Sequence, residues 1–453
     1  MLEKAGRREA SAGRAGSAVV TVGGSLLGAM CAFAAAIVAA RTLSSDDFAS
    51  FGVGLAVHSL CVQLADFGLG TVAVTELATG GGGGTVLPGR VRPLALRRLA
   101  TAIAIGTAIT LVALAIPALE PYRLAVLVGA GGAVFWSMDQ FFVQALQGLH
   151  RFNHAAFVLA LIGILRLALV SAYAVGSLHG IELLVAYAVI APAVAAPIAG
   201  LTLAGQRRRR EGHVDDAAQD REPGSGATVT PEFRRSVAAT YVGGAALFNL
   251  DVLLLALIAS QADVATYSAA WRVAAGVSLV NTAITQAVLP YTVAVADPWG
   301  EARLLARTGV LLSAAWVLAV PLITVAGLAV LGPAGDDAAG PIVVLLLAFA
   351  LDGFCDLAVQ IYYRVNRARI AALTRASEFT TMAAVTVAVQ STGALAPSIG
   401  QLSARSVGVV IIGAPILAAA MGRLDWFQPD QREPRGEALV GVDVRSAEER
   451  LGL

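Results

Sequence analysis

Long apolar runs constrain this chain more than any other feature of its sequence. A helix needs ~20 predominantly apolar residues to cross the hydrocarbon layer of a bilayer. We count about twelve runs of that kind, near 17–40, 49–74, 99–118, 123–146, 154–177, 181–204, 235–259, 265–291, 304–331, 341–363, 369–390 and 396–422. Only helices and closed barrels can cross a membrane, and these runs are too long and too uniformly apolar for barrel strands. The sequence therefore predicts an all-α polytopic membrane protein with about 12 transmembrane helices.

The composition agrees with a membrane protein. Charged residues make up 14% of the 453 residues and hydrophobic residues 57%, whereas a soluble domain carries about 25% charged residues. The net charge of +1 gives no reason to expect nucleic acid as a partner. The three cysteines, Cys31, Cys61 and Cys355, fall inside apolar runs, so we expect them to be small buried residues without a disulfide or metal role. The first run is too long for a signal peptide and is expected to be a retained span.

The basic residues predict the orientation of the spans. With a cytoplasmic N-terminus, 26 of the 32 Lys and Arg residues fall in cytoplasmic segments, and only Arg41 and Arg123 fall in the short outside loops. This asymmetry is what the positive-inside rule describes. The chain then divides into a cytoplasmic tail, a six-helix lobe, a cytoplasmic linker, a second six-helix lobe and a cytoplasmic tail, at residues 1–16, 17–204, 205–234, 235–422 and 423–453.

A short repeat supports the division into two lobes. The predicted outside turn "DFASFG" (Asp47–Gly52) resembles "DVATYS" (Asp263–Ser268), 216 residues further along the chain. Six spans per half is an even number, so the two halves have the same orientation in the membrane. The repeat therefore predicts two six-helix lobes related by a pseudo-twofold axis along the membrane normal, with a cavity between them.

Several segments carry a family resemblance. The segments "AARTLSSDDFASFGVGLAV", "LADFGLGTVAV", "NLDVLLLALIASQADVATYSAAWRV", "QAVLP" and "QALQGLHRFNHAAFVLALIGILRL" resemble spans one and two, seven and eight, and the link between spans four and five of the polysaccharide flippases. These belong to the multidrug/oligosaccharidyl-lipid/polysaccharide exporter superfamily. The resemblance implies a multi-pass protein of the bacterial cytoplasmic membrane with both termini cytoplasmic. It also implies a lipid-linked oligosaccharide as substrate, with membrane lipids and polysaccharide assembly proteins as partners.

Four arginines fall within the predicted spans: Arg166, Arg272, Arg375 and Arg405. A charge at the bilayer centre costs about 2.5–3.5 kcal/mol on insertion scales, so each must be paired or face water. Arg375 precedes Glu378 by three residues, which predicts an ion pair within one helix. The other three arginines are expected to line a water-filled cationic cavity. The alternative is a fixed pair between helices, for example Arg166 with Asp139.

A cationic cavity suits a diphosphate, because the guanidinium group binds phosphate through a planar fork of donors and keeps its charge. Polar residues along the fourth and eighth spans would give the sugar chain a path. A helix-packing role for the glutamines is the alternative. The expected substrate-binding residues are Arg272, Arg166, Arg405, Gln140, Gln144 and Gln286.

The acidic residues within the spans suggest coupling to an ion gradient. Asp352 and Asp356 are one helical turn apart, and two close carboxylates cannot ionise independently. We expect these two and Asp139 to couple transport to H⁺ or Na⁺. The alternative is that they form hydrogen bonds that hold helices together. Asp66 and Asp251 are expected to have structural or gating roles, and no organic cofactor or metal is expected.

Three functions remain open at this point: a flippase for lipid-linked oligosaccharide, an ion-coupled small-molecule or drug antiporter of the same superfamily, and a membrane glycosyltransferase or polysaccharide polymerase. A cavity richer in acids than in arginines would favour the antiporter. Membrane enzymes of the third kind usually carry a sizeable outside loop with catalytic carboxylates, and none is predicted here. The five histidines show no metal-ligand spacing, and no pair of nucleophile and base is evident, so we expect no enzyme activity.

Overall fold

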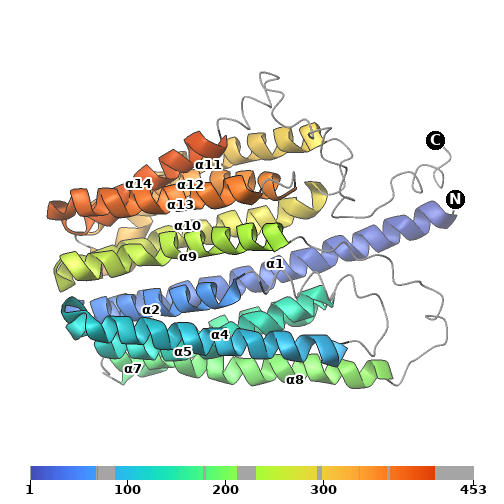
Figure 1. The fold of residues 1–453 in the computed structure, drawn as a ribbon, viewed down its shortest axis with the longest axis horizontal. Coiled ribbons are helices and arrows are strands. Elements are labelled where there is room, and N and C mark those ends of the chain that lie inside the picture. Colours follow the sequence, from blue (N-terminus) through green and yellow to red (C-terminus); the bar gives the residue numbers. More distant parts are fainter. Residues whose placement is uncertain are drawn as a thin grey trace.

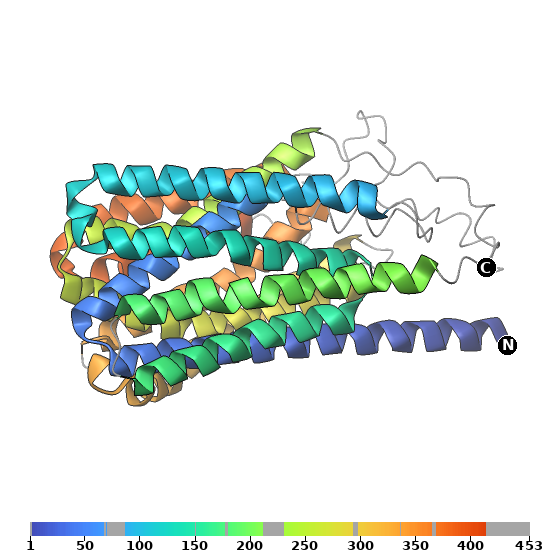
Figure 2. The same ribbon diagram turned by 90° about the horizontal axis from the view of Figure 1, so that it is seen from below.

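The computed structural model describes residues 2–67, 69, 87–149, 151–176, 180–211, 231–292, 298–335, 337–364 and 368–413. Helices and turns make up this part of the chain, which contains no strand. The helices run side by side along one axis, and the N-terminal part of α1 projects beyond the bundle (Figures 1 and 2). The all-α prediction is therefore confirmed.

Six helical spans are described in the first half of the chain. They are α1 (Leu2–Thr42), α2 (Ser45–Asp66), α4 (Leu87–Ala115), α5 (Arg123–Gly148), α6 (Phe152–Val175) and a composite span made of α7 (Gly180–Val185), the π-helical turn η2 (Ala186–Ile190) and α8 (Ala191–Glu211). A 3₁₀ turn, η1 (Pro117–Tyr122), connects α4 to α5.

Six more spans are described in the second half. They are α9 (Pro231–Ile258), α10 (Gln261–Thr292), α11 (Pro298–Leu331), α12 (Ala339–Arg364), α13 (Ala368–Ala388) and α14 (Leu395–Gly408), which continues as the π-helical turn η6 (Val409–Gly413). The 3₁₀ turns η4 (Gly332–Gly335) and η5 (Gln390–Thr392) lie between α11 and α12 and between α13 and α14. The last span of each half thus contains a π-helical turn.

Ten of these helices are long and apolar enough to cross a membrane, within the described residues. Two further long helices, α10 and α13, are not among the ten; α13 carries Arg375 and Glu378, which lower its hydropathy. The ten and the two together match the twelve predicted runs. The predicted tail at residues 1–16 is the start of α1, and α8 extends to Glu211 within the predicted linker. Residues 212–230 of that linker and the predicted tail 423–453 lie outside the described residues.

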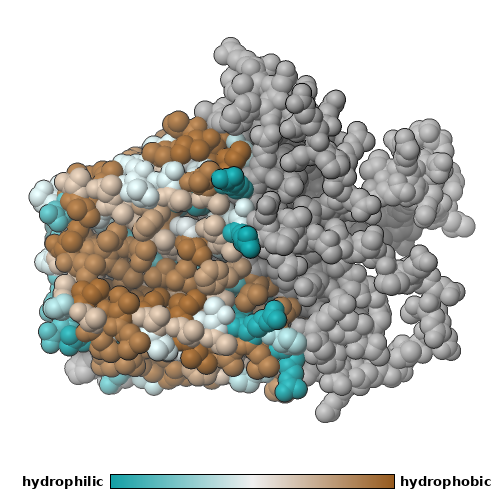
Figure 3. All heavy atoms as spheres, in the orientation of Figure 1, coloured by the Kyte–Doolittle hydropathy of each residue, from teal (hydrophilic) through white to brown (hydrophobic). Residues whose placement is uncertain are grey.

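Large apolar side chains are exposed along the sides of the bundle, where a membrane protein contacts lipid. Leu111, Leu201, Leu318 and Leu322 are all more than 60% exposed. Apolar side chains cover most of the described surface in Figure 3, and hydrophilic ones gather near its margins. These exposed leucines agree with the lipid-facing surface that the apolar runs predict.

The repeated turns have the same local structure in both halves. Ser44 Oγ accepts a hydrogen bond from the backbone N–H of Asp47 at 3.2 Å and donates one to its carboxylate at 2.8 Å. Ser260 makes the same two bonds to Asp263, at 3.2 and 2.6 Å. In each case a serine closes the exposed N-terminus of a helix, α2 or α10. The two turns therefore hold equivalent positions, as the repeat predicts.

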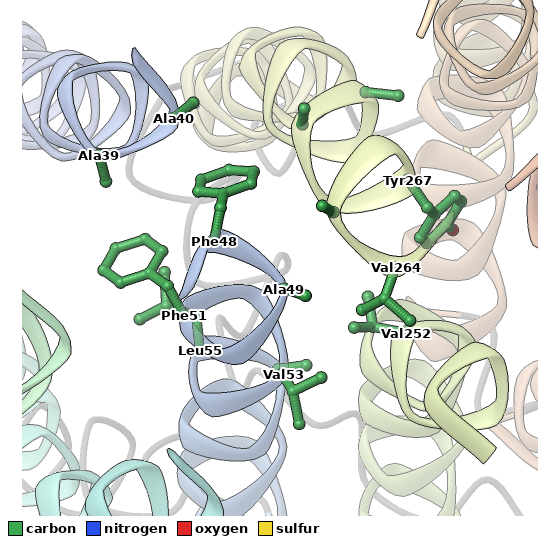
Figure 4. Packing of buried hydrophobic residues seen from close by; sticks show 14 of the residues in the cluster. Ala39, Ala40, Phe48, Ala49, Phe51, Val53, Leu55, Val252, Val264 and Tyr267 are labelled. Carbon is green, nitrogen blue, oxygen red and sulfur yellow. The ribbon is translucent and has the colours of Figure 1, made fainter. Parts of the chain in front are cut away.

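The two lobes pack together at the end of the bundle that holds these turns. Phe48, Phe51 and Val53 of α2 belong to one buried apolar cluster with Val264 and Tyr267 of α10 (Figure 4). Arg41 adds a polar contact from α1 to the C-terminal end of α11. Its Nε donates to the Val330 carbonyl at 2.5 Å and its Nη2 to the Ala329 carbonyl at 2.8 Å. This end of the interface between the lobes is closed.

Candidate binding cavity between the two lobes

A cavity of about 430 Å³ lies between the lobes. Helices α1, α2, α5 and α6 and the turn η2 line it from one lobe, and α9 and α10 line it from the other. On α2 its lining begins at Leu55, after the closed contact of Phe48 and Phe51. On α10 it begins at Ser268, directly after Tyr267. The cavity therefore lies next to the closed contact, further from the turns.

The lining combines cationic, aromatic and neutral polar side chains. Its charged members are Arg166 from α6 and Arg272 from α10, and no carboxylate lines the cavity among the described residues. Trp136, Tyr187 and Trp271 contribute large aromatic rings. Serines, Gln140 and Asn249 contribute neutral polar groups, from both lobes: Ser25, Ser59, Gln140, Asn249 and Ser268. The cavity is cationic, and its aromatic and neutral polar side chains lie among small and aliphatic ones.

Arg166 is held by aromatic rings. Its guanidinium carbon lies 4.2 Å from the ring centre of Trp136 and 4.5 Å from that of Tyr187. Cation–π contacts are each worth about 0.5–2 kcal/mol, so two of them offset much of the ~2.5–3.5 kcal/mol cost of a charge at this depth. Its Nε donates to the Tyr187 carbonyl at 3.3 Å, and its Nη2 has no hydrogen-bond partner within the described residues. The guanidinium is fixed in place, with a donor left for a ligand.

The Tyr187 carbonyl is available because of the π-helical turn. Tyr187 lies in η2, where the regular helical hydrogen bonding is interrupted. Such single π turns free backbone groups and are frequent at functional sites. The Arg166 side chain fills the position of the missing bond.

Arg272 faces the same cavity from the second lobe. It is partly exposed, and its guanidinium carbon lies 5.8 Å from the Trp271 ring centre. No ion pair of 4.0 Å or less involves Arg166 or Arg272 within the part of the chain that the structure describes. The predicted cavity position is therefore observed for both arginines. The alternative of a fixed Arg166–Asp139 ion pair is wrong.

Asp139 is buried and lacks a hydrogen bond within the described part of the chain. Its side chain is 1% exposed, and neither carboxylate oxygen has a hydrogen-bond partner among the described residues. It lies on α5 beside Gln140, which lines the cavity, but Asp139 itself does not line it. Its predicted role in ion coupling stays a prediction.

Arg405 does not line the cavity, contrary to its expected position. It is 1% exposed, and its Nη1 lies 2.8 Å from Asp352 Oδ1 and 3.5 Å from Glu378 Oε2. Its guanidinium carbon lies 4.7 Å from the ring centre of Phe248, which does line the cavity. The position was mispredicted because hydropathy gives the depth of a residue and not the direction of its side chain.

A buried ion network occupies the interior of the second lobe. Arg375 pairs with Glu378 at 2.8 Å, as its spacing predicts, and also with Asp356. Its Nη1 lies 3.7 Å from Asp352 Oδ1. The carboxylates of Asp352, Asp356 and Glu378 thus surround Arg375 and Arg405. We call these five residues the C-lobe network. It holds three acids and two bases, which is one negative charge in excess when all are ionised.

A second charged network lies in the first lobe and includes a residue that the sequence analysis misplaced. Arg98 was counted in a cytoplasmic segment, but it lies within α4, is 1% exposed and forms an ion pair with Asp66. Its Nε donates to Ser137 Oγ at 3.0 Å and its Nη1 to Gln144 Oε1 at 3.3 Å. Gln144 therefore points to Arg98 and does not line the cavity, contrary to expectation. The sequence signal that could have identified Arg98 is the carboxylate of Asp66, which lies at a similar depth on a neighbouring span.

Two of the remaining predicted residues, Asp251 and Gln140, have described positions. Asp251 is fully buried and accepts hydrogen bonds from Trp271 Nε1 at 3.2 Å, Gln401 Nε2 at 2.9 Å and the hydroxyl of Tyr267. These bonds connect α9 to α10 and α14, so Asp251 holds three helices together. Gln140 lines the cavity as predicted. The side chain of Gln286 lies outside the described residues.

His58 is a cavity residue that the sequence analysis did not single out. It is 1% exposed and lies on α2. Its ring stacks on that of Trp136 with a centre-to-centre distance of 4.7 Å. Its Nδ1 lies 3.2 Å from the Gly129 carbonyl, and its Nε2 has no partner within the described residues. A lone histidine in an apolar span was the only available signal.

No group of three or more metal-ligating side chains occurs in the described residues. The three cysteines are free thiols; Cys61 and Cys355 are buried, and Cys31 is partly so. The site is therefore described by its arginines, aromatic rings and neutral polar groups.

Comparison with known proteins agrees with this arrangement. Residues 15–295 match the family described as polysaccharide biosynthesis protein. No curated protein matches the sequence. Among solved structures, the chain is similar to an outward-facing multidrug resistance MATE family transporter of the MOP superfamily, with 14% identity, 90% of this chain and 96% of that chain covered, and a TM-score of 0.57.

Two further solved structures are similar over the same length. A MATE protein in complex with MaL6 has 13% identity, with 90% of this chain and 97% of that chain covered and a TM-score of 0.58. A MOP superfamily transporter from Pyrococcus furiosus, whose binding pocket is described as reversed in polarity, has 15% identity, with 89% and 96% covered and a TM-score of 0.58. At these identities the likeness establishes a shared fold.

Proposed function

Because the chain belongs to the polysaccharide biosynthesis protein family and has the fold of MOP superfamily transporters, we propose that it is a flippase for a polyprenyl-diphosphate-linked oligosaccharide. The observation that carries this proposal is the charge of the cavity. One arginine from each lobe lines it, Arg166 and Arg272, and no carboxylate does so among the described residues. Such a cavity selects an anion.

A diphosphate fits these two arginines chemically. Each guanidinium group can donate two parallel hydrogen bonds to phosphate oxygens. Arg166 is already oriented by Trp136, Tyr187 and the Tyr187 carbonyl, so little side-chain freedom is lost when it binds. The neutral polar lining and the tryptophan rings suit a sugar chain, since sugars present hydroxyl groups together with apolar ring faces.

Movement of the substrate would follow alternating access between the two lobes. The close approach of α2 to α10, at Gly52 and Ser268, lies at the predicted outer end, with the cavity on its cytoplasmic side. This arrangement supports a state that receives substrate from the cytoplasm. Opening to the outside must separate the Arg41 side chain from the Val330 and Ala329 carbonyls.

Coupling to H⁺ or Na⁺ is assigned in this proposal to Asp352 and Asp356, with Asp139 as a further candidate. The C-lobe network has one negative charge in excess, and a bound proton or cation would neutralise it. The network contacts the cavity indirectly, because Arg405 lies against the Phe248 ring. Replacing Asp352 and Asp356 together with asparagine should abolish gradient-driven transport while the protein still inserts.

The setting follows from the proposed substrate. The protein would act in the bacterial cytoplasmic membrane with both termini cytoplasmic, surrounded by membrane lipids and beside polysaccharide assembly proteins, without nucleic acid. A cysteine in place of the exposed Asp337 should then react from outside with an impermeant thiol reagent. Labelling of that cysteine only after lysis would reverse the orientation.

The alternative function is an ion-coupled drug antiporter, which the aromatic lining of Trp136, Tyr187 and Trp271 favours. Proteoliposomes distinguish the two. We expect the purified protein to translocate a fluorescent polyprenyl-diphosphate-linked oligosaccharide and to leave a lipophilic cationic dye untransported under an imposed pH or sodium gradient. Transport of the dye without transport of the lipid-linked sugar would select the antiporter.

A further inference from the structure

His58 lines the cavity and has one ring nitrogen without a hydrogen-bond partner among the described residues. Its Nδ1 lies 3.2 Å from the Gly129 carbonyl, and a carbonyl oxygen can only accept, so Nδ1 carries a proton. In a neutral imidazole the other nitrogen, Nε2, is then an unprotonated acceptor. That nitrogen is buried and has no partner among the described residues.

The surroundings of His58 keep the imidazole neutral. The charged side chains that share the cavity with it are Arg166 on α6 and Arg272 on α10, both cations. Of the nearby acids, Asp139 on α5 does not line the cavity, and Asp251 on α9 is bonded to Tyr267, Trp271 and Gln401. A third positive charge beside two arginines that have no ion pair among the described residues is unfavourable.

The ring is also held in one position. It stacks on Trp136, the ring that supports Arg166. Helices α2 and α5 are in backbone contact here, because a side chain at Gly129 would overlap the Gly54 carbonyl. The imidazole therefore keeps its place in the cavity wall, stacked on the ring that supports Arg166.

We infer that His58 accepts a hydrogen bond from a hydroxyl or amide N–H of the sugar attached to the diphosphate, and that Trp136 and His58 form the subsite for this sugar. The inference rests on the proposed function. An ionised diphosphate has no hydrogen to donate, so a ligand that satisfies both the arginines and Nε2 must combine an anionic group with a nearby donor. The first sugar of a glycosyl diphosphate has this combination.

The test compares two probes on the full-length purified protein in nanodiscs: undecaprenyl diphosphate, which has no sugar, and undecaprenyl diphosphate bearing one N-acetylhexosamine. His58→Phe keeps a stacking ring and removes the acceptor, and His58→Gln keeps a polar atom near the position of Nε2. Loss of one neutral hydrogen bond corresponds to about 3- to 10-fold in affinity. We expect His58→Phe to weaken binding of the sugar-bearing probe by that factor, His58→Gln to recover part of it, and both to leave undecaprenyl diphosphate unchanged.

The control is His154→Phe, a histidine on α6 that does not line the cavity, which should leave both probes unaffected. If His58→Phe lowers the affinity for both probes equally, His58 either contacts the diphosphate or has a purely structural role. Either result would overturn the sugar subsite. Unchanged binding of both probes would overturn it as well. If His58→Phe does not fold, His58→Gln is compared in the same way. A parent protein that binds neither probe would reject the proposed function itself, whereas a parent that binds both equally, with no effect of His58, rejects only the subsite.

Discussion

Buried arginines in this protein have two opposite environments, the wall of the cavity and the interior of a lobe. In the first lobe, Arg166 lies between Trp136 and Tyr187 with no ion pair among the described residues and faces the cavity. In the second lobe, Arg375 and Arg405 are surrounded by the three carboxylates of the C-lobe network and do not line the cavity. The same residue type at membrane depth thus serves as an open ligand site in the cavity wall and as part of a closed network in the lobe interior.

The difference shows that the type of partner decides what a buried arginine can do. An aromatic ring stabilises the cation without neutralising it, so Arg166 still attracts an anion. A carboxylate neutralises the cation, so Arg405 is committed to helix packing or to ion binding within the lobe. Four experiments sharpen this comparison, from the largest expected effect to the smallest.

Truncation of Arg405 should have the largest effect on stability. Arg405→Ala leaves Asp352 and Glu378 with one fewer compensating cation in the lobe interior. Breaking a buried ion pair from one side costs about 3–5 kcal/mol, so thermal unfolding in detergent should shift to a clearly lower temperature. Adding Asp352→Asn to Arg405→Ala should recover part of the loss. An unchanged melting temperature would show that the network does not hold the lobe together.

Truncation of Arg166 or Arg272 should affect binding and spare stability. Both line the cavity without an ion pair among the described residues, so removal leaves no buried carboxylate uncompensated. Losing one partner of a charged contact costs about 2–5 kcal/mol, or 30-fold and more in affinity. Binding of undecaprenyl diphosphate should fall by that factor for Arg272→Ala and less for Arg272→Lys, which keeps the charge and loses the fork.

The matched control for these variants is Arg123→Ala, at an arginine that is exposed at the turn end. It should bind as the parent does. If Arg166→Ala and Arg272→Ala both bind undecaprenyl diphosphate as the parent does, the cationic-cavity proposal fails and the antiporter becomes the better hypothesis.

A third experiment compares polar contacts at equivalent places in the two lobes. Asp66, Arg98 and Ser137 connect α2, α4 and α5. In the second lobe, Trp316 Nε1 donates to Asn281 Oδ1 at 2.6 Å and Asn281 Nδ2 to the Phe349 carbonyl at 3.0 Å, which connects α10, α11 and α12. Asn281 follows Asp66 by 215 residues, close to the repeat offset of 216. The first lobe thus joins its three helices through a charged contact, and the second lobe joins the equivalent helices through neutral hydrogen bonds.

Charge should therefore decide the size of the effect. Asp66→Ala strands a buried cation and should destabilise by up to about 3–5 kcal/mol, whereas Asn281→Ala removes neutral hydrogen bonds and should cost about 1–3 kcal/mol. Chemical or thermal unfolding of both variants measures the difference. Replacing Asp66 and Arg98 together with leucine should restore much of the loss. Equal effects of Asp66→Ala and Asn281→Ala would contradict the contrast.

The fold was predictable to the level of helices because run length and hydropathy reflect the thickness of the membrane. The helix caps at Ser44 and Ser260 could also be predicted from the repeated turns, because each serine bonds to a residue only three positions further along the chain. Side-chain partners were not predictable in this way. Arg98 with Asp66 and Arg405 with Asp352 join helices that are far apart in the chain, and hydropathy carries no information about which faces meet. Only the Arg375–Glu378 pair, three residues apart, was predicted correctly.

The smallest effect on stability is expected for the replacement of Asp139. This residue is a buried carboxylate of the first lobe with no ion pair among the described residues, whereas Asp352 of the second lobe lies 2.8 Å from Arg405. An isolated ionised carboxylate at that depth is unfavourable, so the group is expected to be neutral, and asparagine is then a close replacement in shape and charge.

Asp139→Asn should therefore change the unfolding free energy by less than ~1 kcal/mol, since no bond is broken and no charge is removed. Asp352→Asn should cost more, because it leaves Arg405 with the more distant Glu378 alone. Melting temperatures of the two variants, measured side by side, give the stability comparison.

Gradient-driven transport in proteoliposomes then separates the roles of Asp139. If Asp139→Asn is stable but no longer couples transport to the gradient, Asp139 carries the proton. If Asp139→Asn is stable and still couples transport, the C-lobe network is the coupling site. A large loss of stability would show that Asp139 is ionised and paired in the folded protein, which would remove the contrast between the two lobes at this position.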